Sequence, residues 1–338
     1  MQPIFIGGCE RSGTTMLGSM LSAHPNYQAT PESQFKNYLF NWFDYPDTLQ
    51  PDECRRILDF LPTNFRFRLW NLVADKEALL EACRTRSIGG LLVELARQYA
   101  WQVARNAHAT VWIDHSPDNI SLTRELLHYL PEARFIHIVR DGRAIAASVL
   151  PLDWGPNTIK GAADLWTQRL AQGFTAEQAL KASGRFTTLR YEDLVCDPEM
   201  TLRKLCAEIN LEFHPNMLTG NGLQTTVYNS RQHALVGKAP EKDRINAWEE
   251  QLQPRQIEIF EWMTEPMLRN LDYPLKFNGK ARAPKRTEWL QMEVEHYLGK
   301  VKNVIRRKKR IKRALLTAPK TSISEQRVVQ VGALSAGA

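Results

Sequence analysis

The sequence predicts a three-layer α/β fold, with helices on both faces of a mainly parallel sheet. The prediction rests on three short apolar runs, each followed by a helical pattern: Ile4–Ile6, Val111–Ile113 and Phe135–Val139. The last run is almost wholly apolar, as in strands buried on both faces, and strands that alternate with helices form parallel sheets. With 338 residues, 43% of them hydrophobic, the chain is long enough to bury such a core.

The first strand leads into a loop with the spacing of a phosphate-binding loop. Gly8 and Gly13 enclose four residues, and an apolar helical stripe over Met16–Leu21 follows. Backbone N–H groups of such a loop can point at an anion, and the helix dipole favours negative charge there. Loops that bind nucleoside triphosphates need a lysine after the second glycine, where this chain has Thr14; its positive charge lies upstream, at Arg11. An ordinary strand-to-helix turn is the simpler alternative.

Arg11-Ser12-Gly13-Thr14-Thr15 resembles the 5′-phosphosulfate loop of sulfotransferases that use the donor 3′-phosphoadenosine 5′-phosphosulfate (PAPS). The resemblance implies a P-loop-like fold and transfer of a sulfuryl group from PAPS to an acceptor hydroxyl, with 3′-phosphoadenosine 5′-phosphate (PAP) as product. It also implies that residues 12–15 hold the 5′-phosphate, while Arg11 stabilises the charge that builds on the leaving oxygen. The sulfuryl group carries less charge than a phosphoryl group, so we expect no metal ion.

Tyr27–Thr30 is a candidate second strand, and Glu32 follows it closely. In several sulfotransferase families a glutamate at this place takes the proton of the acceptor hydroxyl. The resemblance therefore makes Glu32 the first candidate for the general base. Without it, a solvated surface carboxylate would be the simpler interpretation.

The segment from about 38 to 110 is expected to be a helical insert, and it carries no second nucleotide motif. Its aromatic side chains could line an acceptor pocket, although core packing explains most of them equally well. These residues are Trp42, Phe43, Tyr45, Phe65, Phe67, Trp70 and Trp101.

The strand at Val111–Ile113 ends in Asp114-His115-Ser116-Pro117. Sulfotransferases often have Lys-Thr-Pro or Lys-Asp-Pro here, with the lysine reaching the donor, and this chain has His115 at the lysine position. A histidine can donate a hydrogen bond to the sulfuryl group or act as a base near neutral pH. A single histidine is more often structural, so His115 is the second candidate for the base.

The next predicted helix is Leu122–Leu130, and the strand Phe135–Val139 leads into a segment that runs from Arg140 to Ser148. This segment resembles the 3′-phosphate motif of sulfotransferases, in which an arginine and a serine eight residues later hold that phosphate. Arg140 lies at the carboxyl end of a strand, where ligands bind in open α/β sheets, and a guanidinium matches a phosphate bidentately. The alternative is a salt bridge between Arg140 and Asp141.

Two later segments also resemble the family. A strand from Phe186 leads to Tyr191-Glu192-Asp193-Leu194, and the resemblance implies that Tyr191 contacts the donor. The segment from 218 to 244 is expected to be a loop over the donor, in which Lys238, ten residues before a tryptophan, would contact phosphate. Lys242 and Arg244 could serve as well.

The resemblance ends near Pro274, so we expect a sulfotransferase domain over residues 1–277 and an extension over 278–338. Nine basic residues and no acidic residue lie between 300 and 313, more than the whole net charge of +7. The remaining chain is therefore slightly acidic and does not indicate nucleic-acid binding. Residues 287–316 predict a helix with a basic face that could contact an anionic membrane, and 318–338 are expected to be disordered.

The five cysteines show no C-x-x-C pair, which suits reduced thiols in a cytoplasmic protein without a zinc site. No signal peptide or membrane span is expected. A carbohydrate, lipid or small alcohol is the expected acceptor, and a tyrosyl protein is the alternative because residues 140–143 also resemble tyrosyl-protein sulfotransferases. The competing functions are a nucleotide kinase with a degenerate loop and a non-catalytic adaptor at the membrane surface.

Overall fold

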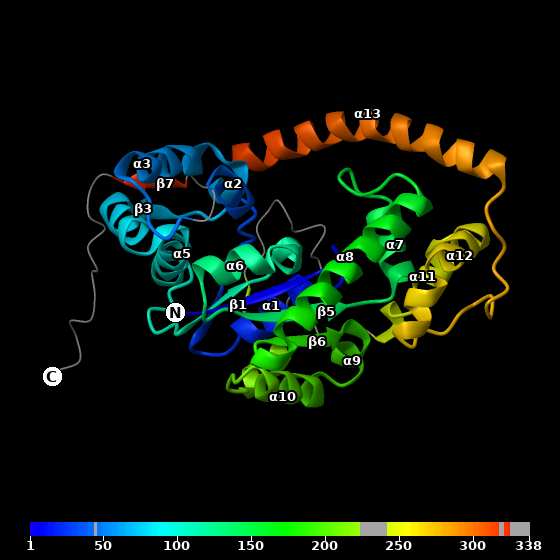
Figure 1. The fold of residues 1–338 in the computed structure, drawn as a ribbon, viewed down its shortest axis with the longest axis horizontal. Coiled ribbons are helices and arrows are strands. Elements are labelled where there is room, and N and C mark those ends of the chain that lie inside the picture. Colours follow the sequence, from blue (N-terminus) through cyan, green and yellow to red (C-terminus); the bar gives the residue numbers. More distant parts are fainter. Residues whose placement is uncertain (44–45, 224–241, 318–320, 325–338) are drawn as a thin grey trace.

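A computed structural model of the chain describes residues 1–43, 46–223, 242–317 and 321–324. Its centre is a five-stranded sheet of order β2-β4-β1-β5-β6 in which every pair is parallel (Figure 1). The strands are β1 Gln2–Gly8, β2 Tyr27–Ala29, β4 Val111–Asp114, β5 Arg134–Val139 and β6 Phe186–Arg190. The predicted parallel α/β fold is confirmed.

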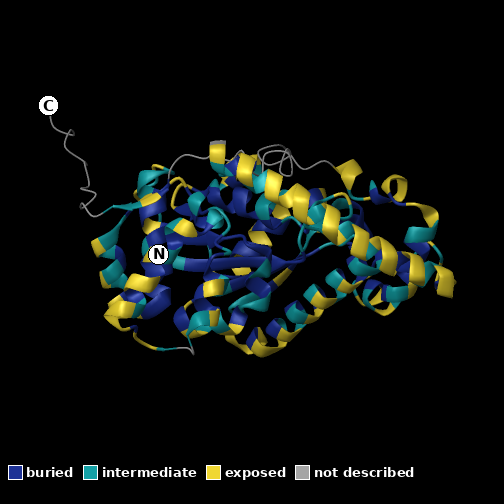
Figure 2. Cartoon of the chain, turned by 90° about the horizontal axis from the view of Figure 1, so that it is seen from above, coloured by how far each residue is buried: buried dark blue, intermediate teal, exposed yellow. Residues whose placement is uncertain are grey.

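Helices cover both faces of the sheet, and successive side chains of each strand point to opposite faces. On β1, Ile4 and Ile6 pack toward helices α1 (Thr14–Ser22) and α10 (Pro198–Glu208). Phe5 points the other way, into a cluster with α5 (Lys76–Gln102) and α6 (Thr123–Tyr129). All three side chains are fully buried, and Figure 2 shows the sheet as the buried centre of the molecule. The layers are therefore helix, sheet and helix, as predicted.

A third cluster packs beside the end of β5. It joins helices α7 (Gly142–Val149), α8 (Ile159–Leu180), α11 (Trp248–Gln251) and α12 (Pro254–Asn270). At the start of α10 the Asp197 side chain accepts a hydrogen bond from the Met200 amide, and Pro198 occupies the first helical position. Outside the insert, the other short helices are α9 (Tyr191–Cys196), η2 (Pro117–Ser121), η3 (Lys181–Ser183), η4 (Pro215–Thr219) and η5 (Lys242–Arg244). The insert contains one further short helix, η1 (Leu61–Thr63), beside those described next.

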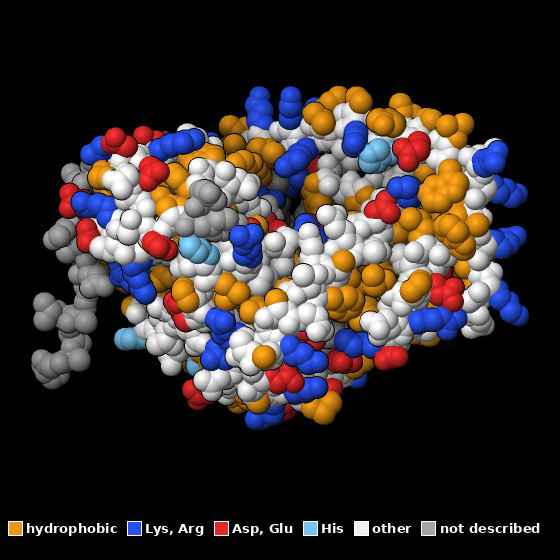
Figure 3. Space-filling model, in the orientation of Figure 1, with side chains coloured by type: hydrophobic (Ala, Val, Ile, Leu, Met, Phe, Trp, Pro, Cys, Tyr) orange, Lys and Arg blue, Asp and Glu red, His pale blue; other side chains and the backbone are white. Residues whose placement is uncertain are grey.

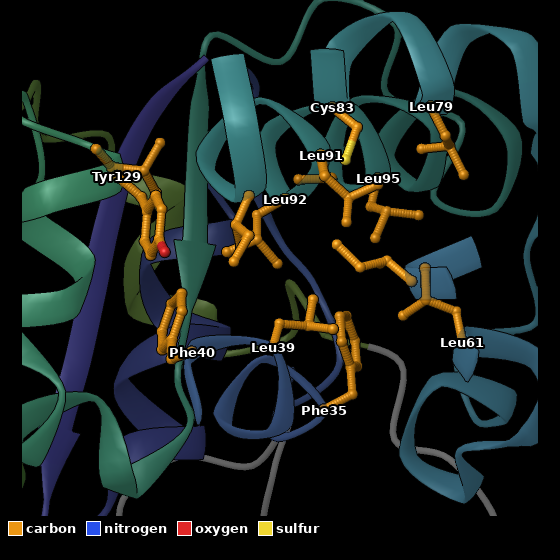
Figure 4. Close-up of a cluster of buried hydrophobic side chains, with 14 of the residues drawn as sticks. Phe35, Leu39, Phe40, Leu61, Leu79, Cys83, Leu91, Leu92, Leu95 and Tyr129 are labelled. Atoms are coloured by element: carbon orange, nitrogen blue, oxygen red, sulfur yellow. The ribbon is translucent and has the colours of Figure 1, made fainter. Parts of the chain in front are cut away.

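The insert is mostly helical, as predicted, and has a hydrophobic core of its own. It contains α2 (Lys36–Trp42), α3 (Pro51–Phe60), α4 (Phe65–Arg68) and α5, and also a short strand that the sequence does not predict, β3 (Val73–Asp75). Figure 4 shows the cluster between these helices, where Phe40 stacks on Tyr129 near leucines of α5. Core packing is the correct interpretation for Trp42, Phe43, Phe67 and Trp70; Tyr45 lies outside the described residues.

The C-terminal extension packs on the rest of the chain. Helix α13 (Arg286–Thr317) runs from the end of α12 across the molecule to the insert, where β7 (Ser322–Ser324) pairs in parallel with β3 (Figure 1). At its start Arg255 Nε donates to Glu288 at 2.8 Å, and farther along Arg310 Nε donates to Asp153 at 2.9 Å. The prediction that residues 318–338 are disordered is therefore wrong for Ser322–Ser324, which form a strand. Among the described helices, none is both long and apolar enough to cross a membrane.

Candidate donor and acceptor site

The candidate residues gather at one edge of the sheet because each follows the carboxyl end of a strand. In a parallel sheet these ends lie together, and ligands bind there where the strand order reverses, here beside β1. The residues are Arg11 after β1, Glu32 after β2, His115 after β4, Arg140 after β5 and Tyr191 after β6.

The loop after β1 has the backbone of an anion site. Gly13, with φ of 106°, is the N-cap of α1, and neither a capping side chain nor an acidic residue occupies the first helical turn. The amides at this helix start can therefore point at an anion. Arg11 has φ of 72°, a conformation that is unfavourable for a long side chain and is found mainly where the surrounding structure imposes it, often at ligand sites.

Arg11, Arg140 and Ser148 are brought together, although 137 positions separate the first and last in sequence. Arg11 Nε donates to Ser148 Oγ at 3.0 Å, and Arg140 Nη1 donates to the Arg11 carbonyl at 3.0 Å. The Arg140 guanidinium lies 4.1 Å from the centre of the Tyr191 ring, and that ring covers Gly13, where a Cβ would come within 2.7 Å of it. The two predicted phosphate motifs thus form one cluster.

The electrostatics of this cluster favour an anion. Burial and the neighbouring charge of Arg140 lower the pKa of Arg11, while the charge of Glu32 raises it. Within the described residues, two buried polar atoms of the cluster, Ser12 Oγ and Arg140 Nε, have no hydrogen-bond partner. A ligand with phosphate groups would supply the missing acceptors and offset the repulsion between the two cations.

The alternative salt bridge of Arg140 is wrong, because Asp141 pairs with Arg143 instead. The Arg143 guanidinium is buried, 2.7 Å from Asp141 Oδ2 and 2.6 Å from Glu261 Oε1. Asp141 also caps α7 by accepting from the Arg143 amide. This buried network holds the strand end and leaves the Arg140 side chain directed toward the loop after β1.

Glu32 lies in the segment between β2 and α2, where side-chain contacts hold its carboxylate. Its carboxylate is 3.4 Å from Arg66 Nη1 of the insert and accepts a hydrogen bond from Gln34 Nε2 at 3.2 Å. The Glu32 side chain is 13% exposed. The next residue anchors this segment, since the Ser33 amide donates to Ser116 Oγ at 3.0 Å. These contacts fix the position of Glu32, and its negative charge raises the pKa of Arg11.

The segment that follows Glu32 is held by a buried ion pair that the sequence does not predict. Lys36 Nζ and Asp114 Oδ2 are 3.3 Å apart, and both side chains are fully buried. Asp114 also accepts from the Ser116 amide at 2.8 Å and from the Ser33 hydroxyl. Burial raises the pKa of Asp114, but Lys36 and these hydrogen bonds outweigh it and lower the pKa to about 2. No local pattern marks Lys36, because its partner is 78 positions away.

His115 is placed differently from Glu32. Its buried side chain packs against Gly18 of α1, where an added Cβ would lie 3.2 Å from the ring, and no hydrogen bond to its Nδ1 is found in the described part of the chain. His115 therefore stays the second candidate for the base, as a prediction. Lys238 lies outside the described residues, while Lys242 and Arg244 form η5.

A polar cavity of about 350 Å³ opens next to Glu32. Two of its wall residues, Gln34 and Arg66, are the side chains that contact the Glu32 carboxylate. The loop after β1, the insert, α8 and α13 all contribute to it. The lining consists of amides (Gln34, Asn37, Asn41, Asn64), charged groups (Glu10, Arg66, Asp118, Arg169, Arg307) and two aromatic rings (Tyr38, Phe65).

A family model described as "Sulfotransferase family" matches residues 3–215, more than half of the chain. The matched region contains Arg11, Glu32, His115, Arg140 and Tyr191. The chain therefore belongs to the sulfotransferase family.

Relatives and solved structures agree with this assignment. The chain is 25% identical over 223 residues to protein-tyrosine sulfotransferase 1 of Danio rerio, covering 64% of this chain and 56% of that protein. It is 23% identical to the protein-tyrosine sulfotransferase of Drosophila melanogaster, covering 64% of this chain and 40% of the relative. It thus spans roughly half of these relatives' lengths.

Two solved sulfotransferase domains share the fold. One, from the curacin biosynthetic pathway, aligns with a TM-score of 0.51 at 19% identity, covering 80% of this chain and 98% of that domain. The other, from the olefin synthase of Synechococcus PCC 7002, aligns with a TM-score of 0.50 at 23% identity, covering 81% and 95%.

The Lys36–Asp114 pair predicts a pH dependence of stability. Because the folded-state pKa of Asp114 is depressed to about 2, its stabilising contribution is present above the unfolded-state pKa of about 3.9 and is lost as the pH falls through the folded value. Urea unfolding between about pH 5 and pH 2 should therefore show the native chain losing about 2 kcal/mol more than the double variant Lys36→Met, Asp114→Asn. Asp52→Asn, at an exposed pair, should follow the native chain. Equal losses in the native chain and the double variant would contradict this account.

Proposed function

We propose that this sulfotransferase moves the sulfuryl group of PAPS to a hydroxyl of an acceptor bound in the polar cavity. The carrying observation is the position of Glu32, whose carboxylate contacts Gln34 and Arg66 of the cavity lining and whose charge raises the pKa of Arg11 in the donor loop. A base beside the acceptor thus faces a cation beside the donor. The orphaned Ser12 and Arg140 atoms fit a donor with two separate phosphate groups.

The proposed mechanism gives each residue of the site one role. Residues 12–15 and the start of α1 bind the 5′-phosphate, and Arg140 with Ser148 binds the 3′-phosphate. Glu32 accepts the proton of the attacking hydroxyl, and Arg11 stabilises the oxygen that leaves with the phosphate. Holding both reactants in line provides a further large part of the rate.

The lining of the cavity favours an acceptor with several hydroxyl groups. Each of its amide side chains offers both donors and an acceptor, which matches hydroxyls that also do both. Tyr38 and Phe65 add two aromatic rings to this lining, the kind of side chain on which the apolar side of a sugar packs. We therefore propose a carbohydrate-type alcohol as acceptor. A tyrosyl peptide is the second candidate, supported by the two protein-tyrosine sulfotransferases to which the chain is similar.

An acceptor screen with labelled PAPS separates these candidates. We expect label to be transferred to oligosaccharides and polyols, because their adjacent hydroxyls can satisfy neighbouring amides of the cavity. Asn37→Leu should raise KM for such acceptors while leaving PAP affinity unchanged, since Asn37 lines the cavity and not the donor loop. Transfer to tyrosyl peptides alone would assign the acceptor to the second class.

Glu32→Gln tests the assignment of the base. The amide keeps the shape of the side chain but cannot take a proton, so turnover should fall by ~10²–10⁴ while PAP affinity stays unchanged. Glu199→Gln, at an exposed pair on α10, is the matched control and should retain full activity. If Glu32→Gln remains active while His115→Ala loses turnover, His115 is the base and the assignment is reversed.

A further inference from the structure

The outer face of α13 is an apolar surface that nothing in the described structure covers. Eight of the twelve large hydrophobic side chains that are exposed in the described part of the chain belong to this helix. Seven of them form what we call the α13 stripe: Leu290, Val294, Tyr297, Leu298, Val301, Val304 and Ile305.

The spacing of the α13 stripe places it on one side of the helix. Its members recur at intervals of three and four residues from Leu290 to Ile305, a length of about 22 Å along the axis. The opposite side faces the body of the molecule, where Met292 is buried and Asn303 donates to Asn157 at 2.8 Å. The stripe therefore points to solvent, as Figure 3 shows in orange along the top of the molecule.

Basic residues continue the exposed surface toward the end of the helix. Lys308, Lys309, Lys312 and Arg313 are exposed, and no acidic residue lies between positions 300 and 313. In Figure 3 the blue side chains at the top lie beside the orange ones on the same helix. An apolar stripe next to unbalanced positive charge is the composition of a helix that lies in the plane of a membrane surface.

We propose that α13 docks the protein on an anionic lipid bilayer, with the stripe in the headgroup region and the lysines against acidic lipids. A second copy of the chain fits this face less well. A parallel pair would set the two basic segments side by side. An antiparallel pair would bring Glu293 and Glu295 near Lys302 and Lys300 of the other copy, but it would leave residues 308–313 beside Lys285 and Arg286. Residues 308–313 thus meet like charge in both arrangements, whereas an anionic surface neutralises them.

Docking would also orient the active site. Arg307 of the same helix lines the acceptor cavity, so the cavity lies directly beneath the docked helix. The proposal is independent of the identity of the acceptor, because binding to lipid requires neither donor nor acceptor.

The test is sedimentation of the full chain with phosphatidylcholine vesicles, with and without phosphatidylserine, at low salt. The native chain should bind only the vesicles that contain phosphatidylserine. Leu298→Asp with Val301→Asp should weaken binding roughly tenfold or more, and so should Lys308→Glu with Lys309→Glu. The controls are Met200→Asp and Lys204→Glu, exposed positions on α10 away from this face, and both should bind like the native chain.

Circular dichroism and thermal unfolding of each variant confirm that α13 still folds. Equal vesicle binding by the native chain and both α13 variants would overturn the proposal. So would a native chain that ignores vesicles but forms a dimer in light scattering that the stripe variant abolishes, since the face would then bind a second copy.

Discussion

The site depends on two guanidinium groups that are held together at the carboxyl edge of the sheet. Arg140 donates to the backbone of Arg11, Arg11 donates to Ser148, and the positive φ of Arg11 adds backbone strain. Burial and mutual repulsion make this arrangement unfavourable by itself, as the lowered pKa of Arg11 indicates. A bound anion between the two motifs would reverse the balance, because it would supply the opposite charge and acceptors for the orphaned atoms.

Two buried ion networks near neighbouring strand ends hold the residues of the site in place. The ion pair of Lys36 and Asp114 attaches the segment after β2, which carries Glu32, to the end of β4. Arg143, Asp141 and Glu261 fix the start of α7 after β5, so Arg140 keeps its direction. Buried pairs of this kind add little net stability but strongly penalise any arrangement that separates them. They are therefore suited to holding the side chains of Glu32 and Arg140 in fixed positions.

Local patterns in the sequence predicted the parts of the fold that depend on neighbouring residues. Apolar runs located β1, β4 and β5, and the resemblance to sulfotransferases singled out Arg11–Thr15 and Arg140–Ser148, which the structure brings together. The parts that were missed depend on partners far apart in the chain. Lys36 pairs with Asp114, β7 pairs with β3, and Glu261 completes the ion network of Arg143, and none of these long-range pairings has a local signature. The basic composition of α13 could likewise be read from the sequence. Which side of the helix faces solvent could not, because that depends on its contacts with distant residues such as Asn157.

Titration calorimetry tests the central claim, that Arg11 and Arg140 form one site for a donor with two phosphate groups. PAP should bind without a metal ion, and Arg140→Ala should weaken it by on the order of 1.5–3 kcal/mol, the value of a charged hydrogen bond. ATP with Mg²⁺ should bind more weakly than PAP, because the loop has Thr14 in place of the lysine that nucleoside triphosphates require. Tighter binding of ATP with Mg²⁺, or unchanged PAP affinity in Arg140→Ala, would contradict the account.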